Sequence, residues 1–197
     1  MIVVLGRPGL TADDRLDRSA GRIAQAAAAA GARVELVGSV GDDPDGEKVA
    51  LELGRAGIGH AALLRDPAGA TPRRDVDGVF GDEPLPRLEA ADIDLGLRYV
   101  PECHVLVAAE PLDDPGLKVV TDAAVYHGAA LIVLVAAGSS PPGALPESAT
   151  VLEMPEADEG AFNDLVGRFA ALLDDGREAA AAWHDALADT GWESASE

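Results

Sequence analysis

The sequence predicts an α/β fold in which a mostly parallel sheet lies between two layers of helices. Short apolar segments rich in β-branched residues alternate with longer amphipathic segments along nearly the whole chain of 197 residues. Such alternation is typical of strands joined by helical crossovers, which place parallel strands side by side and cover both faces of the sheet. No internal repeat and no linker divides the sequence, so we expect one domain over residues 1–190 and a polar tail at 191–197.

The expected strands are short apolar runs bounded by turn-forming residues. The first is β-branched and is followed by Gly6, as in a buried parallel strand. The strand at 34–37 is expected to end at Gly38, before a tight turn through Gly41. In chain order, we expect strands at residues 2–5, 34–37, 61–64, 104–108, 131–135 and 151–154.

The expected helices carry recognisable end signals. Asp43 is a natural N-cap, and Pro44 suits the first helical position because it has no N–H to satisfy. The helix that follows is expected to bury Val49, Leu51 and Leu53. The first helix contains a run of five alanines, the best helix-forming residue. We expect helices at residues 19–30, 45–55, 92–99, 113–127, 158–173 and 177–187.

Two segments are expected to lack regular structure. Residues 6–18 form a polar loop, whose acidic part at 13–17 is expected to be an ordinary surface. Residues 65–88 contain four prolines, which interrupt both helices and central strands. Short strand candidates lie within the second segment at 73–76 and 79–80.

The composition excludes several classes of partner. The chain carries 35 acidic and 15 basic residues, a formal net charge of −20, so neither nucleic acid nor an anionic membrane is expected to bind, because both need a cationic face. No basic region precedes the first apolar residues, which therefore indicate a strand and not a signal peptide. Cys103 is the single cysteine, which rules out an intrachain disulfide and favours a reducing, cytoplasmic location.

The stretch at residues 31–58, GARVELVGSVGDDPDGEKVALELGRAGI, resembles the ribokinase (PfkB) family of sugar and nucleoside kinases. Its VGSVGDDPDG segment is similar to the family's Val-Gly-x-Val-Gly-x-Asp-x-x-Gly turn. The preceding SAGRIAQAAAAAGA is similar to the family helix whose N-terminus meets the sugar. Residues 70–73, residues 103–108 and Glu110 follow the family's order. The resemblance implies a three-layer α/β/α ribokinase-like domain.

The resemblance also implies a small-molecule site at the carboxyl ends of the strands, where ligands of open parallel sheets bind. The family's sugar-binding aspartate falls near Leu10 or Thr11 in this chain, and its helix asparagine aligns with Arg22. One glycine of its helix pair is kept, at Gly21. Arg22, near a helix start, would favour an anionic ligand. The implied substrate-binding positions are Thr11, Gly21, Arg22, Gly38, Gly41 and Asp43.

The family's lid is expected to be reduced or absent. The loop between the first strand and the first helix has about a dozen residues, too few for the extra strands of a ribokinase lid. Residues 73–80 lie where the family places lid strands that in many members also pair subunits, and Arg73 and Arg74 could complement an acidic patch on a second copy. We therefore expect a homodimer or a complex with another subunit, and a homodimer should strengthen with salt as repulsion is screened.

The family's phosphotransfer motif, Gly-Ala-Gly-Asp at a helix N-terminus, is absent from the sequence. In the family its N–H groups form the anion hole and its aspartate is the general base. Two alignments of the C-terminal part are open. One matches residues 149–162 to the central strand and magnesium motif, so that the nucleotide half is missing. The other matches residues 158–176 to the helix after the phosphotransfer motif, which places Gly160 at the aspartate. The order of the preceding strand favours the first.

Either alignment removes the anion hole and the base, and no P-loop replaces them. We therefore expect a non-catalytic ligand- or partner-binding domain with no catalytic residues, no metal and no cofactor. The alternative is a minimal sugar or nucleoside kinase that uses ATP and Mg²⁺ and is completed by another subunit. The four histidines lack metal-ligand spacing, and the acidic Glu156, Asp158 and Glu159 are explained by the dipole of the helix that they begin.

Overall fold

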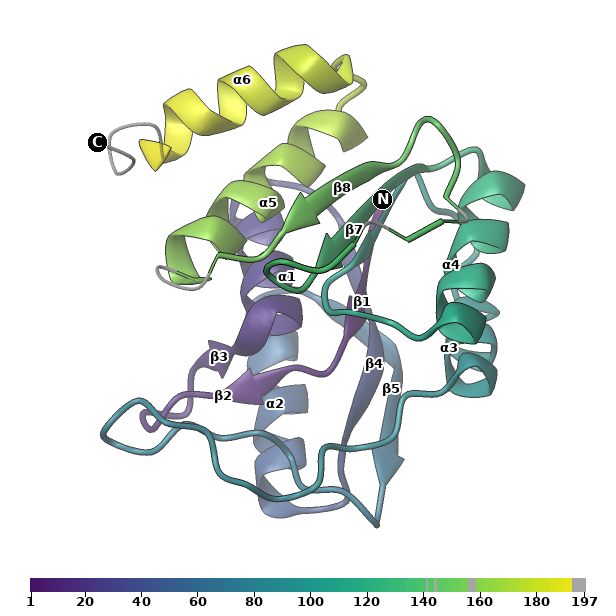
Figure 1. Ribbon diagram of the computed structural model, residues 1–197. Coiled ribbons are helices and arrows are strands. Elements are labelled where there is room, and N and C mark those ends of the chain that lie inside the picture. The colour runs from purple at the N-terminus through teal and green to yellow at the C-terminus, as the bar shows by residue number, and fades with distance from the viewer. Residues whose placement is uncertain (141, 144, 156–158, 193–197) are drawn as a thin grey trace.

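The computed structural model describes residues 1–140, 142–143, 145–155 and 159–192, and its main sheet has six strands. All the strand pairs in this sheet are parallel, as the sequence predicts. The spatial order is β5-β4-β1-β6-β7-β8, so the first strand lies inside the sheet (Figure 1). The strands are β1 (Ile2–Gly6), β4 (Val34–Gly41), β5 (Gly59–Asp66), β6 (Val105–Ala108), β7 (Ala130–Val135) and β8 (Thr150–Glu153).

Helices cover both faces of the sheet. One face is covered by α1 (Arg18–Ala29), α2 (Pro44–Arg55) and α5 (Glu159–Asp174). The other face is covered by α3 (Ala90–Leu97) and α4 (Asp114–His127). The last described helix, α6 (Ala179–Thr190), packs on α5 (Figure 1). The predicted three-layer α/β/α arrangement is confirmed.

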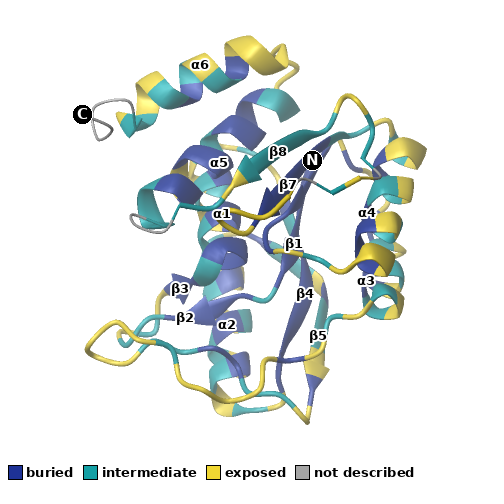
Figure 2. Ribbon diagram, viewed as in Figure 1, coloured by how far each residue is buried: buried dark blue, intermediate teal, exposed yellow. Residues whose placement is uncertain are grey.

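The core lies on both sides of β1. Ile2 and Val4 face the layer of α1 and α5, whereas Val3 and Leu5 face the layer of α3 and α4. All four residues are completely buried, and the β1 ribbon has the colour of buried residues in Figure 2. Burial on both faces explains why this strand is continuously apolar instead of alternating.

The alanine run of the first helix permits a close contact between α1 and α5. A Cβ added at Gly167 of α5 would lie 2.5 Å from the Cβ of Ala26 and 2.8 Å from the carbonyl oxygen of Ile23. Small side chains on both helices are therefore needed where the two backbones approach. The alanines thus pack against another helix as well as favouring helix formation.

The predicted end signals of α2 and α4 are confirmed, whereas the helices expected at 92–99 and 177–187 span Ala90–Leu97 and Ala179–Thr190. The Asp43 side chain accepts a hydrogen bond of 2.7 Å from the N–H of Gly46, and Pro44 begins α2. Gly57 and Gly128, which follow α2 and α4, have φ angles of +71° and +64°, a region that glycine enters without steric cost.

Two local predictions are wrong. The strand expected at 34–37 continues through Gly41, because its neighbour β5 pairs with it as far as the Gly41–Asp66 register. Leu51 was expected in the core but is 54% exposed. Val49 and Leu53 are four residues apart and share the buried face of α2, whereas Leu51 lies between them and faces the opposite side.

The loop at residues 6–18 contains more structure than the sequence predicts. It forms an antiparallel pair, β2 (Gly9–Leu10) and β3 (Leu16–Asp17). Residues 73–76 and 79–80, expected as short strands, contribute only isolated bridges, from Arg73 to Leu10 and from Arg74 to Phe80. The described residues between β1 and α1 thus hold only a pair of two-residue strands, which agrees with the predicted reduction of the lid.

Some predictions fall outside the described residues. These are the tail at 193–197 and the predicted start of a helix at Asp158; within the described chain this helix begins at Glu159. Among the residues that the structure describes, no helix is both long and apolar enough to cross a bilayer.

Candidate functional site

The chain reverses its direction of winding across the sheet beside β1. From β1 it passes to β4 and β5 on one side, and it then returns to β6 on the other side. Open parallel sheets bind ligands at such a switch point, outside the carboxyl ends of the strands. At these ends lie Gly6, the last residue of β1, and Arg7 after it, and Ala109 and Glu110 after β6.

A cavity of about 240 Å³ lies at this switch point. The N-termini of α1 and α5 approach it together, and the Ser19 hydroxyl donates to the Glu159 carboxylate at 3.4 Å. The segment after β6, the residue after β8 and Phe80 of the crossing segment close the remaining sides. The lining residues are Arg18, Ser19, Phe80, Ala109, Glu110, Pro111, Met154 and Glu159.

Three arginines and three carboxylates form a cluster around this cavity: Arg7, Arg18, Arg74, Asp17, Glu110 and Glu159. Arg7 Nε donates to Glu110 Oε1 at 2.6 Å, and the Arg7 backbone N–H donates to Oε2 of the same carboxylate at 3.3 Å. Arg74 bridges two carboxylates, through Nε to Asp17 and through Nη2 to Glu159 at 3.1 Å. Every carboxylate of the cluster is thus bonded to a guanidinium, which offsets the cost of burying its charge.

Arg18 differs from the other two arginines of the cluster. Its Nη2 lies 3.8 Å from Glu110 Oε2, beyond hydrogen-bond distance, and its guanidinium carbon lies 5.5 Å from the centre of the Phe80 ring. Burial lowers the pKa of Arg18, and Arg7 adds to that shift, whereas Glu110 opposes it. Its backbone has a φ of +59°, which is uncommon for a residue with a side chain.

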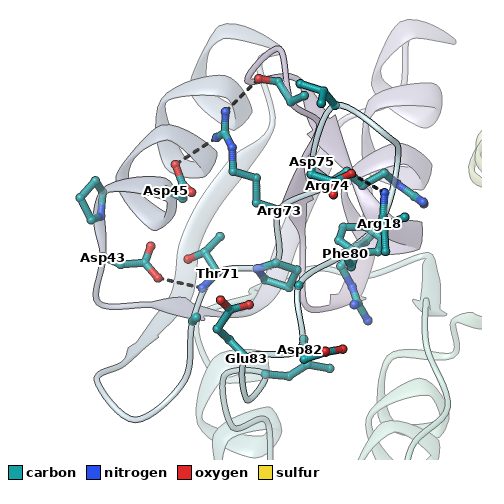
Figure 3. A pocket seen from close by; sticks show the side chains of 18 residues that line it. Arg18, Asp43, Asp45, Thr71, Arg73, Arg74, Asp75, Phe80, Asp82 and Glu83 are labelled. Carbon is teal, nitrogen blue, oxygen red and sulfur yellow. Dashed lines mark hydrogen bonds and ion pairs between the residues drawn. The ribbon is translucent and has the colours of Figure 1, made fainter.

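A larger cavity of about 900 Å³ adjoins the first and shares Arg18 and Phe80 with it. It lies between the N-terminus of α2 and the crossing segment at residues 70–85 (Figure 3). The Phe80 ring stacks against Arg74, whose guanidinium carbon is 4.2 Å from the ring centre. Phe80 therefore lines both cavities and is held in place by its contacts with arginines.

Asp43 lines the larger cavity and holds its wall in place. Its Oδ2 accepts a hydrogen bond of 2.8 Å from the N–H of Thr71, which joins the crossing segment to the start of α2 (Figure 3). Burial raises the pKa of the Asp43 carboxyl, but N–H hydrogen bonds from Thr71 and Gly46 outweigh this effect, and the net shift is downward. At neutral pH the Asp43 carboxyl is therefore ionised, and both of its oxygens accept hydrogen bonds from backbone N–H groups.

The structure separates the other predicted binding residues from the cavities. Thr11 lies in the β2–β3 turn, where its hydroxyl accepts a hydrogen bond of 3.1 Å from the Arg15 N–H. Gly21 is buried in α1, and Arg22 approaches Asp164 of α5 at 3.6 Å. None of these three lines either cavity among the residues described at the carboxyl edge of the sheet.

Gly38 and Gly41 occupy places where backbones approach closely. Gly38 lies opposite Gly6, and a Cβ at Gly38 would lie 1.9 Å from the Gly6 carbonyl oxygen. The N–H of Gly41 donates to Thr71 Oγ1 at 2.9 Å, and a Cβ there would lie 2.8 Å from the Thr71 nitrogen. Close backbone contacts thus explain why both positions are glycine, independently of any ligand.

Sequence reasoning missed most of the cluster. The rule that placed the site at the carboxyl ends of strands also indicates Arg7 and Glu110, which follow β1 and β6 within two residues. The sequence assigned Asp17 to an ordinary acidic surface, yet it is 3% exposed and bonded to Arg74. No local signal marks Asp17 as buried, because its partner is 57 residues away.

The two arginines expected to face a second subunit are bonded within the chain. Arg73 Nη1 lies 2.7 Å from Asp14 and 3.0 Å from Asp45, and Arg74 belongs to the cluster described above. The exposed part of this segment is its tip, where Val76 and Val79 are 90% and 60% exposed. A second copy would therefore meet valines here rather than unpaired arginines.

Histidine, cysteine and acidic side chains are the groups that could hold a metal ion, and two of the acidic candidates, Glu156 and Asp158, lie outside the described residues. Within residues 1–140, 142–143, 145–155 and 159–192, no group of three or more His, Cys, Asp or Glu side chains is arranged to hold an ion. Cys103 is buried, and its burial raises the pKa of the thiol to about 11, so the thiolate form is scarce at neutral pH.

No family model and no curated protein matches the chain. Solved structures do match it. A protein of E. coli assigned as a ribokinase II, solved with ATP and Mg²⁺, has a TM-score of 0.67 and 13% identity over 94% of this chain and 89% of its own. Arabidopsis thaliana ribokinase, solved with ribose and ATP, has a TM-score of 0.66 and 14% identity over 96% and 90%.

A more distant match is fructokinase from Xylella fastidiosa, with a TM-score of 0.51 and 13% identity over 98% of this chain and 66% of its own. The neighbours share one architecture, an α/β sheet fold found in sugar kinases. The chain therefore has the ribokinase-like fold that its sequence implied, in a shortened form.

Proposed function

We propose that this protein binds a small polyhydroxylated molecule, of the sugar or polyol class, in the cavity between β1 and β6, and that it does not transfer phosphate. The observation that carries the proposal is the arginine–carboxylate cluster at the switch point. Sugar hydroxyls donate to carboxylates such as Glu110 and accept from guanidiniums and from Ser19, so the wall offers both kinds of partner. Neighbours with this fold include a ribokinase solved with ribose.

The position of α5 supports the loss of phosphotransfer. In the resembling family, the helix after Gly-Ala-Gly-Asp and the first helix both meet the sugar at their N-termini. Here α5 and α1 come together in the same way, through Glu159 and Ser19. This favours the second alignment, an internal deletion with Gly160 at the aspartate, over the first. Gly160 has no side chain that could accept a proton from a bound hydroxyl.

ATP and Mg²⁺, which the fold implies, fit the described residues poorly. Magnesium prefers carboxylate and carbonyl oxygens, yet the described chain has no acidic cluster arranged for an ion. The N–H groups and aspartate of the phosphotransfer motif also have no counterpart in the sequence. The proposal therefore includes no cofactor and no catalytic residue.

One observation favours a kinase as the second candidate. Glu159 lines the cavity in the first turn of α5, next to the position of the missing aspartate, and its side chain is 44% exposed. A carboxylate there could accept a proton if another subunit supplied the nucleotide. Its ion pair with Arg74 at 3.1 Å, however, already occupies one of its two oxygens.

Calorimetric titration of the purified chain tests both functions. Thermal-shift screening with pentoses, hexoses and their alditols would identify a binder, and ATP·Mg²⁺ would be titrated alone and with that binder. We expect sugar or polyol binding and no ATP·Mg²⁺ binding below the millimolar range. ATP·Mg²⁺ binding below that range, with phosphorylated product, would establish the kinase instead.

Two matched variants locate the binding. Glu110→Gln keeps the shape of the side chain but removes the charge, and should weaken binding by about 10- to 100-fold, the loss typical of a hydrogen bond to a charged group. Glu147→Gln removes a charge from an exposed loop position and should leave the affinity unchanged. Equal affinity in the two variants would place the site elsewhere.

A further inference from the structure

The guanidinium of Arg18 has hydrogen-bonding capacity that the protein does not use. Its side chain is 24% exposed, and it makes no hydrogen bond to any residue in the described ranges. Arg7 and Arg74, by contrast, donate to carboxylates and also to the carbonyl oxygens of Pro86 and Gly78. A guanidinium carries five N–H donors, and those of Arg18 remain available to a ligand that enters the cavities.

The backbone at Arg18 is strained as well. Its φ of +59° lies in the left-handed region, although it is the first residue of α1. Such strain costs on the order of 1–3 kcal/mol for a residue with a side chain, and it clusters at ligand sites because the surrounding structure has to enforce it. Arg18 thus combines a strained backbone, a position in the walls of both cavities and N–H donors that form no hydrogen bond with the described residues.

The first turn of α1 carries no acidic side chain of its own, and the carboxylates next to it, Asp17 and Glu159, are paired with Arg74. The N-cap Asp17 makes no side-chain capping bond, because Arg74 occupies that carboxylate. The α2, α3, α4 and α5 helices each have an acidic residue in the first turn, whereas α6, like α1, has none. The positive end of the α1 dipole and the Arg18 guanidinium therefore favour an anion at the same wall.

We infer that the ligand of this cavity is a polyhydroxylated acid, and that Arg18 binds its carboxylate or phosphate group. This inference rests on the proposed sugar or polyol function and specifies its ligand class. The hydroxyls face Glu110 and Ser19, and the acidic group faces Arg18 at the border with the larger cavity. The fork of a guanidinium matches two oxygens of a carboxylate or phosphate, which makes Arg18 a specificity-determining residue.

The inference places the anion at a different arginine from the one that the sequence suggested. The sequence assigned an anionic ligand to Arg22, which lies one helical turn further along α1. Arg22 faces α5, where its guanidinium would be 3.4 Å from a Cβ at Gly160, and its Nη2 lies 3.6 Å from Asp164. Its buried Nε has no hydrogen-bond partner among the described residues, but Arg22 lines neither cavity. The anion-binding arginine of the cavity is therefore Arg18.

Matched acidic and neutral probes test this inference. The purified chain is titrated with four- to six-carbon alditols, with the corresponding aldonates such as D-gluconate, and with D-ribose 5-phosphate against D-ribose. We expect at least one acid to bind about tenfold or more tightly than its neutral partner. The aldonate and phosphate arms show which acidic group is preferred.

Variants of Arg18 connect the preference to the residue. Arg18→Gln should weaken binding of the acid by about 10- to 100-fold and change binding of a neutral polyol by less than about twofold. Arg18→Asn is a second variant that also removes the guanidinium. It suits the backbone at this position, because asparagine enters the left-handed region more readily than most residues. Arg33→Gln, at an arginine that is 67% exposed near the opposite end of the sheet, is the matched control and should bind as the unmodified chain does.

The outcomes separate this inference from the proposed function. Neutral polyols that bind as tightly as the acids, with Arg18→Gln unaffected, would overturn the inference and leave the proposed function standing. Binding of neither series would overturn both. Acid binding that is lost equally in Arg18→Gln and Arg33→Gln would assign the preference to general charge and would also overturn the inference.

Discussion

Alanine substitutions at two glycines distinguish structural positions from ligand-binding positions. Gly38 and Gly21 were both predicted to bind ligand. A Cβ at Gly38 would lie 1.9 Å from the carbonyl oxygen and 3.1 Å from the carbonyl carbon of Gly6, on the neighbouring strand. Both atoms belong to the backbone of β1, so no side-chain rotation relieves the contact. The strands would have to separate by roughly 1 Å in a close-packed core.

Gly21 provides the matched comparison. A Cβ at this position would lie 3.5 Å from the Cβ of Leu16 and 3.6 Å from the Cβ of Pro8, which are ordinary contact distances. Gly21 lies within α1, where alanine is favoured over glycine by about 0.5–1 kcal/mol. Gly21→Ala should therefore be neutral or stabilising.

The size of each effect follows from these contacts. Overpacking typically costs about 1–3 kcal/mol, and Gly38→Ala should reach about 3 kcal/mol because the obstacle is backbone. For a chain of this length, each kcal/mol changes Tm by roughly 2–4 °C. We expect Gly38→Ala to lower Tm by about 6–12 °C and Gly21→Ala to raise it by up to about 4 °C, as measured by scanning calorimetry.

Two results would refute this reasoning. An unchanged Tm for Gly38→Ala would mean that the two strands are not in close contact at this register. A Tm for Gly21→Ala lowered by more than about 3 °C would mean that the space beside α1 is smaller than the structure indicates. Loss of ligand binding in Gly21→Ala without a change in Tm would restore the original assignment of this glycine to the binding site.

Three further predictions concern pH, core polarity and association. Because the folded pKa of Asp43 lies below its ordinary value of 3.8, its stabilising effect is present above that pH and is lost as pH falls through the folded pKa. Asp43→Asn should lower the free energy of unfolding by about 1 kcal/mol at pH 7. Urea melts should show that the difference between the variant and the unmodified chain shrinks below pH 3.8, and a difference that stays constant with pH would contradict the lowered pKa of Asp43. Asn163 is fully buried, and its amide has no hydrogen bond within the described residues, so Asn163→Leu should raise Tm by about 2–6 °C; a lower Tm would reveal a polar partner. Sedimentation should show a homodimer that strengthens with salt, and a monomer at low and high salt across micromolar concentrations would exclude it.

Much of the fold was predictable because its signals are local. Strand 2–5, the helix ending at Gly128 and the Asp43 cap each depend on a few neighbouring residues, whose backbone preferences act within one or two turns. The misplacement of Leu51 was also local in origin, because the periodicity of α2 leaves it on the exposed face. The two-residue strands β2 and β3 gave too short a pattern to be recognised.

The sequence by itself determined the alternation of strands and helices, the ribokinase-like resemblance and the absence of the phosphotransfer motif. Only the tertiary structure decided which charged groups meet. Arg7 and Glu110 are 103 residues apart, and Ser19 and Glu159 are 140 apart. They become neighbours because β1 lies next to β6 and because α1 packs on α5. Pairing between such distant charges depends on strand order and helix packing, which leave no periodic trace along the chain.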